Sequence, residues 1–138
     1  MSDLLTPDEL ALFQHAPEEE LVDLAIDLDV PVPSEIDRGG LLDACIRNLA
    51  DLGRREGLPF SDYDKEDLGY LCDTELNAIA ALNGVDIGLD RTKKLQLLVK
   101  TGKKNYKVWR KARPKSQIPI YLPMLLTAVA RLLVSSEG

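Results

Sequence analysis

The chain has 138 residues, of which 45% are hydrophobic, so it can build one domain with a core of its own. Charged residues make up 29% of the sequence, which indicates a well-solvated surface and excludes a chain too apolar to stay in water. The first residues lack the basic region and apolar run of a secretory signal. We therefore expect a cytoplasmic protein whose two cysteines, Cys45 and Cys72, are buried free thiols.

The formal net charge of −6 conceals a strong asymmetry along the chain. Residues 1–90 hold 22 acidic and 5 basic side chains, a balance of −17, whereas residues 91–138 hold 12 basic side chains and one acid, a balance of +11. Such segregation indicates a polyanion-binding surface, an acidic partner, or contact between the two oppositely charged parts.

The first part of the chain predicts three helices. Thr6 begins a capping-box pattern typical of a short helix, and Pro17 with three glutamates opens a second helix. The second helix carries one apolar stripe and must stop before Pro31. A third helix follows a proline-stiffened loop and is expected to end near Gly53. The polar segment 54–60 is the candidate linker between two halves.

The second part predicts further helices and no sheet. A turn or short helix from Ser61 leads to a helix that ends at Asn83-Gly84, followed by an extended stretch. A helix then resumes, and because Gly102 can break or bend it, the pattern leaves open whether it continues to Pro114. The segment 116–138 holds the cleanest apolar helical stripe. No segment alternates with a period of two, so we expect an all-α fold with little or no sheet.

Two stretches of the chain repeat one pattern at an offset of 55 residues. Glu20-Leu21-x-x-Leu24-Ala25 followed by Val30-x-Val32 matches Glu75-Leu76-x-x-Ile79-Ala80 followed by Val85-x-Ile87. With two residues fewer in the loop, Arg38-x-x-x-Leu42 matches Arg91-x-x-x-Leu95. Each unit is therefore predicted to consist of a helix, an extended loop and a second helix.

This pattern resembles the helix-extended-loop-helix superfamily, which includes SAP, LEM and Rho N-terminal domains. The two matches cover less than half of the chain. The second copy is closer to the SAP-like pattern because Arg91-Thr92-Lys93-Lys94-Leu95 resembles the basic start of that family's second helix, whereas Gly39-Gly40 stands there in the first copy. The resemblance implies DNA binding for a SAP-like unit and protein binding for a LEM-like unit.

These patterns divide the chain into four parts. The expected parts are an N-terminal helix with the first, acidic unit (1–53), a linker (54–60), the second, basic unit (61–115) and a C-terminal packing helix (116–138).

The C-terminal helix is expected to be structural. Its apolar residues form more than one stripe, so it must be covered by its own chain or, in a homodimer, by a second copy through residues 121–134. The apolar run from Ile118 to Val134 is shorter than the roughly 20 residues of a membrane span. It also contains Pro119, Pro123 and an arginine. We therefore expect a buried helix that does not enter a membrane, with Pro123 in its first turn.

The sequence carries no pattern typical of an enzyme or a metal site. His15 is the only histidine, no Cys/His cluster has zinc spacing, and no glycine-rich loop of a phosphate site occurs. We therefore predict a non-enzymatic protein with no catalytic residue, no metal and no cofactor.

The leading candidate site is the acid-free stretch after Asp90, where cations surround Tyr106 and Trp109. Clustered cations can neutralise phosphates, and interleaved aromatic rings can stack on unpaired bases. The plainer alternative is a solvated helix whose two aromatic rings pack inward and whose cations pair with the acidic half. The residues predicted to bind nucleic acid are Arg91, Lys93, Lys94, Lys100, Lys103, Lys104, Lys107, Trp109, Arg110 and Lys111.

The competing hypothesis is a protein-interaction module that docks through the acidic first unit, such as an adaptor, a regulator or an immunity-type inhibitor. Its excess of negative charge can mimic a polyanion or steer a basic partner. The residues expected to contact such a partner are Glu18, Glu19, Glu20, Asp23 and Asp27.

Overall fold

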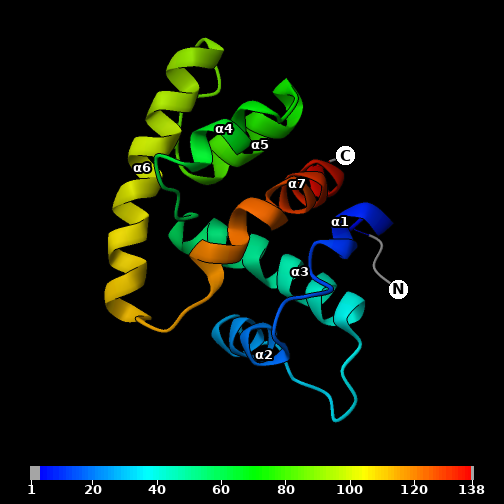
Figure 1. Cartoon of the computed structure of the whole chain (residues 1–138). Coiled ribbons are helices and arrows are strands. Elements are labelled where there is room, and N and C mark those ends of the chain that lie inside the picture. Colours follow the sequence, from blue (N-terminus) through cyan, green and yellow to red (C-terminus); the bar gives the residue numbers. More distant parts are fainter. Residues whose placement is uncertain (1–3, 138) are drawn as a thin grey trace.

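Seven helices account for the fold of residues 4–137, which are the residues that the computed structural model describes (Figure 1). About two thirds of the chain is helical, and no strand occurs among the described residues, so the all-α prediction is confirmed. In chain order the helices are α1 (Pro7–Ala11), α2 (Glu18–Asp27), α3 (Arg38–Glu56), α4 (Asp64–Gly69), α5 (Asp73–Leu82), α6 (Arg91–Ala112) and α7 (Ile118–Glu137).

Local caps start the helices where the sequence places polar residues. At α1 the Thr6 side chain accepts the Glu9 N–H at 3.2 Å, and the Glu9 carboxylate accepts the Thr6 N–H at 2.9 Å. At α6 the Asp90 side chain accepts the Lys93 N–H at 2.9 Å. These bonds satisfy backbone donors that a helix start leaves without a partner.

The 55-residue repeat of the sequence is also a repeat of backbone geometry. Helices α2 and α5 end in the same turn, in which the N–H of Val30 donates to the Ala25 carbonyl and that of Val85 to the Ala80 carbonyl, each at 2.8 Å. The residue before each valine is left-handed, with φ of 57° at Asp29 and 72° at Gly84. This six-to-one hydrogen bond with a left-handed residue is a Schellman ending.

The paired arginines that begin the long helices also have matching roles. Arg38 of α3 donates to the carbonyls of Phe13 and Ala16 at 2.8 and 2.7 Å, just before α2. Arg91 of α6 donates to carbonyls of Gly69 and Leu71 at 2.8 and 2.5 Å, just before α5. Each arginine therefore ties the start of its long helix to the chain that enters the preceding helix.

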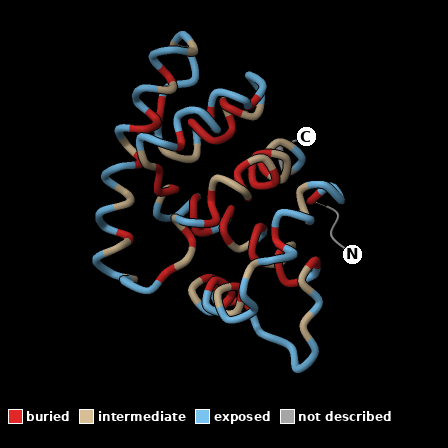
Figure 2. The backbone as a smooth tube through the Cα atoms, viewed as in Figure 1, coloured by how far each residue is buried: buried red, intermediate tan, exposed pale blue. Residues whose placement is uncertain are grey.

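Helix α7 fills the space between the two units. It packs against α3, α4 and α5, and buried residues from both units and from α7 join one hydrophobic core (Figure 2). Two further contacts hold it: the Phe13 and Tyr121 rings stack at 5.9 Å between centroids, and the Tyr121 hydroxyl donates to the Glu20 carboxylate. Burial, followed by this bond to Glu20, raises the pKa of Tyr121 to about 12.

Segment 54–60, the predicted linker, is partly helical and partly buried in the structure. Helix α3 continues to Glu56, and Gly57 turns the chain with a φ of 81°. Leu58, Pro59 and Phe60 are then buried in the core. Two breakers and several charges made the segment look solvent-exposed, but its apolar residues join the two units into one packed body.

Two details of α7 differ from expectation. The helix begins at Ile118, so Pro123 is its sixth residue and not part of its first turn. The helix is also long and apolar enough to cross a membrane by length and composition, so the length argument against a span was wrong. Half of the apolar window Ile118–Ser135 is buried inside the fold.

The two cysteines lie in different environments. Cys45 is buried in α3, as expected, and burial raises its pKa to about 12. Cys72 is exposed, so the prediction of a second buried thiol was wrong. It stands directly before α5, where its backbone N–H donates to the Glu75 carboxylate at 3.1 Å. The aliphatic neighbours of Cys72 pack inward while Cys72 itself occupies the helix cap.

Candidate nucleic-acid interface

Helix α6 is continuous through Gly102, which settles the question that the sequence left open. A Cβ at Gly102 would lie 2.5 Å from the Cβ of Phe60, so only glycine allows the 58–60 segment to lie against the helix. The Gly102 carbonyl accepts the Phe60 N–H at 3.0 Å. Through this contact the 58–60 segment packs against the middle of α6.

Five lysines of α6 form one exposed row, which we call the lysine stripe. Spacings of 7, 4, 3 and 4 residues place them on a single face of the helix. Within the described part of the chain, no ion pair or hydrogen bond involves their side chains. At about 1.5 Å per residue the row is about 27 Å long. The lysine stripe consists of Lys93, Lys100, Lys104, Lys107 and Lys111.

Other predicted binding residues of α6 serve the fold instead. Lys94 is 6% exposed and donates to the Asn77 side chain at 2.6 Å, while Arg91 bonds Asp73 and two backbone carbonyls. Arg110 donates to the Ser116 carbonyl at 2.8 Å and thereby holds the loop before α7. Helical spacing puts these cations off the face of the stripe, but which faces of α6 lie against the fold depends on what packs there.

Trp109 is not available to stack on a base. Its ring is 3% exposed, its indole N–H donates to the Ser116 hydroxyl at 3.0 Å, and the Arg113 guanidinium lies over it at 4.3 Å. The prediction of an aromatic ring presented to nucleic acid therefore fails at Trp109. The inward packing of the plainer alternative is correct for this residue, since a large apolar ring contributes more when it is buried.

A hollow of about 280 Å³ lies beside the lysine stripe, between α6 and the turn that precedes α4. Phe60 is buried there, and Lys103 forms an ion pair with Asp62 at 2.5 Å. Tyr63 lines the same hollow and is 90% exposed. No sequence signal pointed to Tyr63, because it lies outside the basic run and only tertiary packing brings it to α6. Lys103, Lys104, Tyr106 and Lys107 line the α6 side of the hollow.

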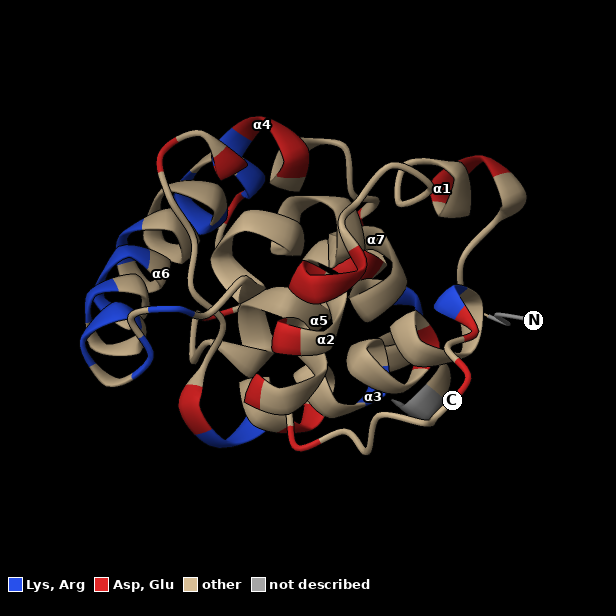
Figure 3. Ribbon diagram, turned by 60° about the horizontal axis from the view of Figure 1, so that its bottom comes forward, with Lys and Arg blue, Asp and Glu red and all other residues tan. Residues whose placement is uncertain are grey.

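The charge asymmetry of the sequence is visible on the folded molecule. Figure 3 shows lysine and arginine gathered along α6, while α1, α2 and α4 carry aspartate and glutamate. Three cations of the basic run pair with acids of the first 90 residues, namely Arg91 with Asp73, Lys103 with Asp62 and Arg113 with Glu56. The lysine stripe takes part in none of the ion pairs of the described residues, so ion pairs with the first 90 residues involve these three cations and leave the stripe unpaired.

The structure brings together only some of the acidic residues predicted to contact a protein partner. Glu18, Glu19 and Asp23 are exposed around a shallow depression on α2. Glu20 instead accepts the Tyr121 hydroxyl, and Asp27 lines a separate cavity. Three of the five expected contact residues therefore share one open face.

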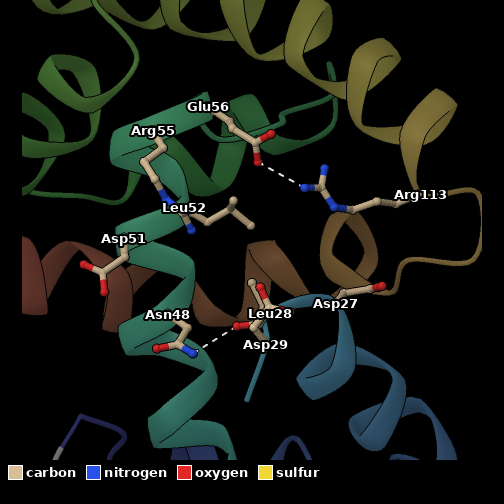
Figure 4. Close-up of a pocket in the computed structure, with 9 residues that line it drawn as sticks. All are labelled: Asp27, Leu28, Asp29, Asn48, Asp51, Leu52, Arg55, Glu56 and Arg113. Atoms are coloured by element: carbon tan, nitrogen blue, oxygen red, sulfur yellow. Dashed lines mark hydrogen bonds and ion pairs between the residues drawn. The ribbon is translucent and has the colours of Figure 1, made fainter. Parts of the chain in front are cut away.

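That separate cavity, of about 360 Å³, lies where the ends of α2, α3 and α6 meet (Figure 4). Asn48 donates to the Leu28 carbonyl at 2.9 Å, and Arg113 pairs with Glu56 at 3.1 Å across it. One oxygen of Asp27 is buried without a hydrogen-bond partner among the described residues. Carboxylates outnumber guanidinium groups here, so the cavity is unsuited to phosphate, and we assign its bonds to holding the three helix ends together.

Comparison with protein-family models, with curated proteins and with solved structures finds no match for this chain. The candidate interface therefore rests on its geometry.

Proposed function

We propose that the chain is a non-enzymatic nucleic-acid-binding module that holds the phosphate backbone with the lysine stripe of α6. The observation that supports this proposal is one row of exposed lysines, about 27 Å long, without acidic partners among the described residues. Polyanions bind such rows because each neutralised phosphate releases condensed counterions.

The internal repeat separates structural residues from candidate binding residues. Residues that make the same contacts in both units are structural. Examples are Ala25 and Ala80, whose carbonyls accept the matching valine N–H, and Arg38 and Arg91, which bond backbone carbonyls. At the offset that pairs these arginines, the α3 positions that match the stripe hold Gly40, Arg47, Asp51 and Arg54, and the two arginines among them pair with aspartates of α3. Since the first unit folds in the same way without a row of unpaired cations, the fold does not require one. The lysine stripe therefore serves either to keep the surface of α6 solvated or to bind a ligand. Because its five side chains all carry positive charge, we favour binding of an anionic ligand.

A salt titration tests the proposal. The probe is a labelled single strand, dT20, with a 20-base-pair duplex in parallel. If all five lysines contact phosphates, the slope of log K against log salt is about −3.5 for the single strand and about −4.5 for the duplex. Affinity for dT20 then falls about 100-fold between 50 and 200 mM salt. No binding of either probe at low salt would reject the proposal.

Matched double variants locate the interface. Lys104→Gln/Lys107→Gln removes two stripe contacts and is expected to reduce the single-strand slope to about −2. Arg47→Gln/Arg55→Gln changes the net charge equally but alters exposed cations of α3. This control is expected to keep the wild-type slope. If the slope of log K against log salt is reduced equally in the two variants, net charge and not the stripe drives binding.

Of the basic helix start that carries the SAP-like resemblance, Lys93 belongs to the lysine stripe, while Arg91 and Lys94 bond within the fold. The LEM-like alternative, a protein partner on Glu18, Glu19 and Asp23, predicts a different result. Charge reversal at these three residues would abolish capture of a protein partner and leave nucleic-acid binding unchanged or stronger.

A further inference from the structure

The hollow beside the lysine stripe combines aromatic and cationic groups in one place. The 61–64 turn supplies Tyr63, and α6 supplies Lys103, Lys104, Tyr106 and Lys107. The turn is held rigidly, because the buried Asp64 carboxylate accepts the Ser61 N–H at 2.6 Å and the Ser61 hydroxyl at 3.1 Å. Tyr63 is therefore presented from a fixed backbone.

The three aromatic residues of the hollow have different roles. Phe60 is 1% exposed and packed over Gly102, and Tyr106 is held by Arg110, whose guanidinium lies 5.7 Å from the centre of its ring. Tyr63 is 90% exposed, and its side chain makes no hydrogen bond within the described residues. Tyr63 lines the hollow and the similarly exposed Tyr70 does not, so Tyr63 is the open ring that a ligand in the hollow can reach.

The charges of the hollow select the kind of ligand. Three lysines face one aspartate, and that aspartate is already paired with Lys103 at 2.5 Å. Lys104 and Lys107 belong both to the hollow and to the lysine stripe, so a phosphate chain on the stripe passes its edge. A volume of about 280 Å³ lies below the roughly 300–1,000 Å³ of pockets that enclose whole small molecules. The hollow therefore suits one flat group of a polymeric ligand whose backbone stays outside the hollow.

We propose that this hollow is a nucleobase subsite that takes one unpaired base of a single-stranded nucleic acid, stacked on Tyr63, while Lys104 and Lys107 hold the adjoining phosphates. This inference rests on the proposed function. It adds that the ligand is single-stranded, because the bases of a duplex are paired and stacked on one another and cannot enter.

Two strands of equal charge test the subsite with the full-length chain. The probes are dT12 and an abasic strand of the same length, which keeps the phosphates and lacks the bases. The wild-type protein is expected to prefer dT12. Tyr63→Ala is expected to weaken dT12 binding roughly 5- to 150-fold, the range for loss of one stacked base, and to leave the abasic strand unaffected. Tyr63→Phe keeps the ring and is expected to bind dT12 as the wild type does.

Tyr70 provides the matched control. It is also an exposed tyrosine next to α4, at 80% exposure, and it does not line the hollow. Tyr70→Ala is expected to leave dT12 binding unchanged. Because Tyr63 and Tyr70 are both exposed, neither alanine variant is expected to shift the melting temperature, so a loss of binding cannot be attributed to misfolding.

The outcomes separate the two proposals. Equal affinity of the wild type for dT12 and the abasic strand, or an unchanged affinity of Tyr63→Ala for dT12, overturns the subsite while phosphate binding by the stripe stands. Displacement of dT12 by an oligoglutamate peptide of similar charge, as effective as that by unlabelled dT12, also overturns it, because a base is then dispensable. Failure of both strands to bind at low salt rejects the proposed function itself.

Discussion

The backbone N–H of Phe60 donates to the carbonyl of Gly102 at 3.0 Å, which joins the segment between the two units to the middle of α6. A Cβ at Gly102 would lie 2.8 Å from the Phe60 nitrogen and 2.5 Å from its Cβ. This contact places the 61–64 turn, and with it Tyr63, beside the lysines of α6.

Gly102→Ala tests this contact. Overpacking against backbone typically costs about 1–3 kcal/mol, and alanine regains about 1 kcal/mol of helix propensity. We expect a net loss of up to about 2 kcal/mol in the free energy of unfolding, measured by urea denaturation. Gly69→Ala is the control, because a Cβ there meets nothing within 4 Å, and it is expected to be neutral or stabilising. A Gly102→Ala variant that gains as much stability as Gly69→Ala would contradict the close approach.

The Schellman ending of α5 makes a second prediction. Gly84 has a φ of 72°, and a Cβ there would meet no atom within 4 Å, so any loss on substitution reports backbone strain alone. Gly84→Ala is expected to cost about 1–2 kcal/mol. Gly84→Asp is expected to cost less, because Asp29 occupies the same place in the first unit and aspartate tolerates the left-handed region. Equal losses for the two variants would show that this tolerance does not operate here.

The Glu9–Arg131 pair predicts a pH dependence of stability. Arg131 donates to both Glu9 oxygens at 2.8 and 3.0 Å, and this hydrogen bonding lowers the pKa of Glu9 below its usual value. A carboxylate with a depressed pKa stabilises the fold above the pKa of the unfolded state, and this contribution disappears as the pH falls through the folded-state pKa.

Glu9→Gln should therefore melt at a lower temperature than the wild type at about pH 7, with the difference shrinking below about pH 4.3, the pKa of an unperturbed glutamate. Glutamine keeps an oxygen for the Thr6 N–H, so the helix cap remains. Asp8→Asn changes a neighbouring exposed acid and serves as the control. A difference between Glu9→Gln and the wild type that stays constant from neutral to strongly acidic pH would refute the role of the ion pair.

Leu126 of α7 is 1% exposed, so the helix is covered by its own chain at this position. Leu126→Ala is expected to cost about 2–5 kcal/mol through lost burial and a cavity. Ile120→Ala, on the same helix at 58% exposure, is expected to cost far less. If residues 121–134 instead formed a dimer seam, melting temperatures would rise with protein concentration. We expect midpoints that do not depend on concentration.

The two thiols are expected to react at different rates. A thiol reagent at mildly alkaline pH should modify Cys72 in the native protein, because it is exposed. Cys45 should react only after unfolding, because burial raises its pKa to about 12 and excludes the reagent. Cys72→Ser is expected to abolish the fast phase and Cys45→Ala to leave it intact. Two fast thiols per native chain would contradict the buried position of Cys45.

The sequence by itself determined the helices, the repeat and the charge segregation. Apolar residues at helical spacing specify which face of a helix turns toward the core. Thr6 and Pro17 at helix starts and Gly84 at a helix end affect only the backbone within a few residues of them. The matched turns after Ala25 and Ala80 follow from the same local chemistry. The extent of α6 did not follow, because whether a glycine breaks a helix depends on what packs against it.

Only the tertiary structure decided which polar residues remain available. Lys94 and Lys104 are alike in the sequence, yet Lys94 is buried against Asn77 and Lys104 is exposed on the stripe. Trp109 is covered by Ser116 and Arg113, whereas Tyr63, outside the basic run, is brought to α6 by the Phe60–Gly102 contact. Periodicity specifies which face of a helix is apolar, but partners distant in the sequence determine which cations and rings stay open to a ligand.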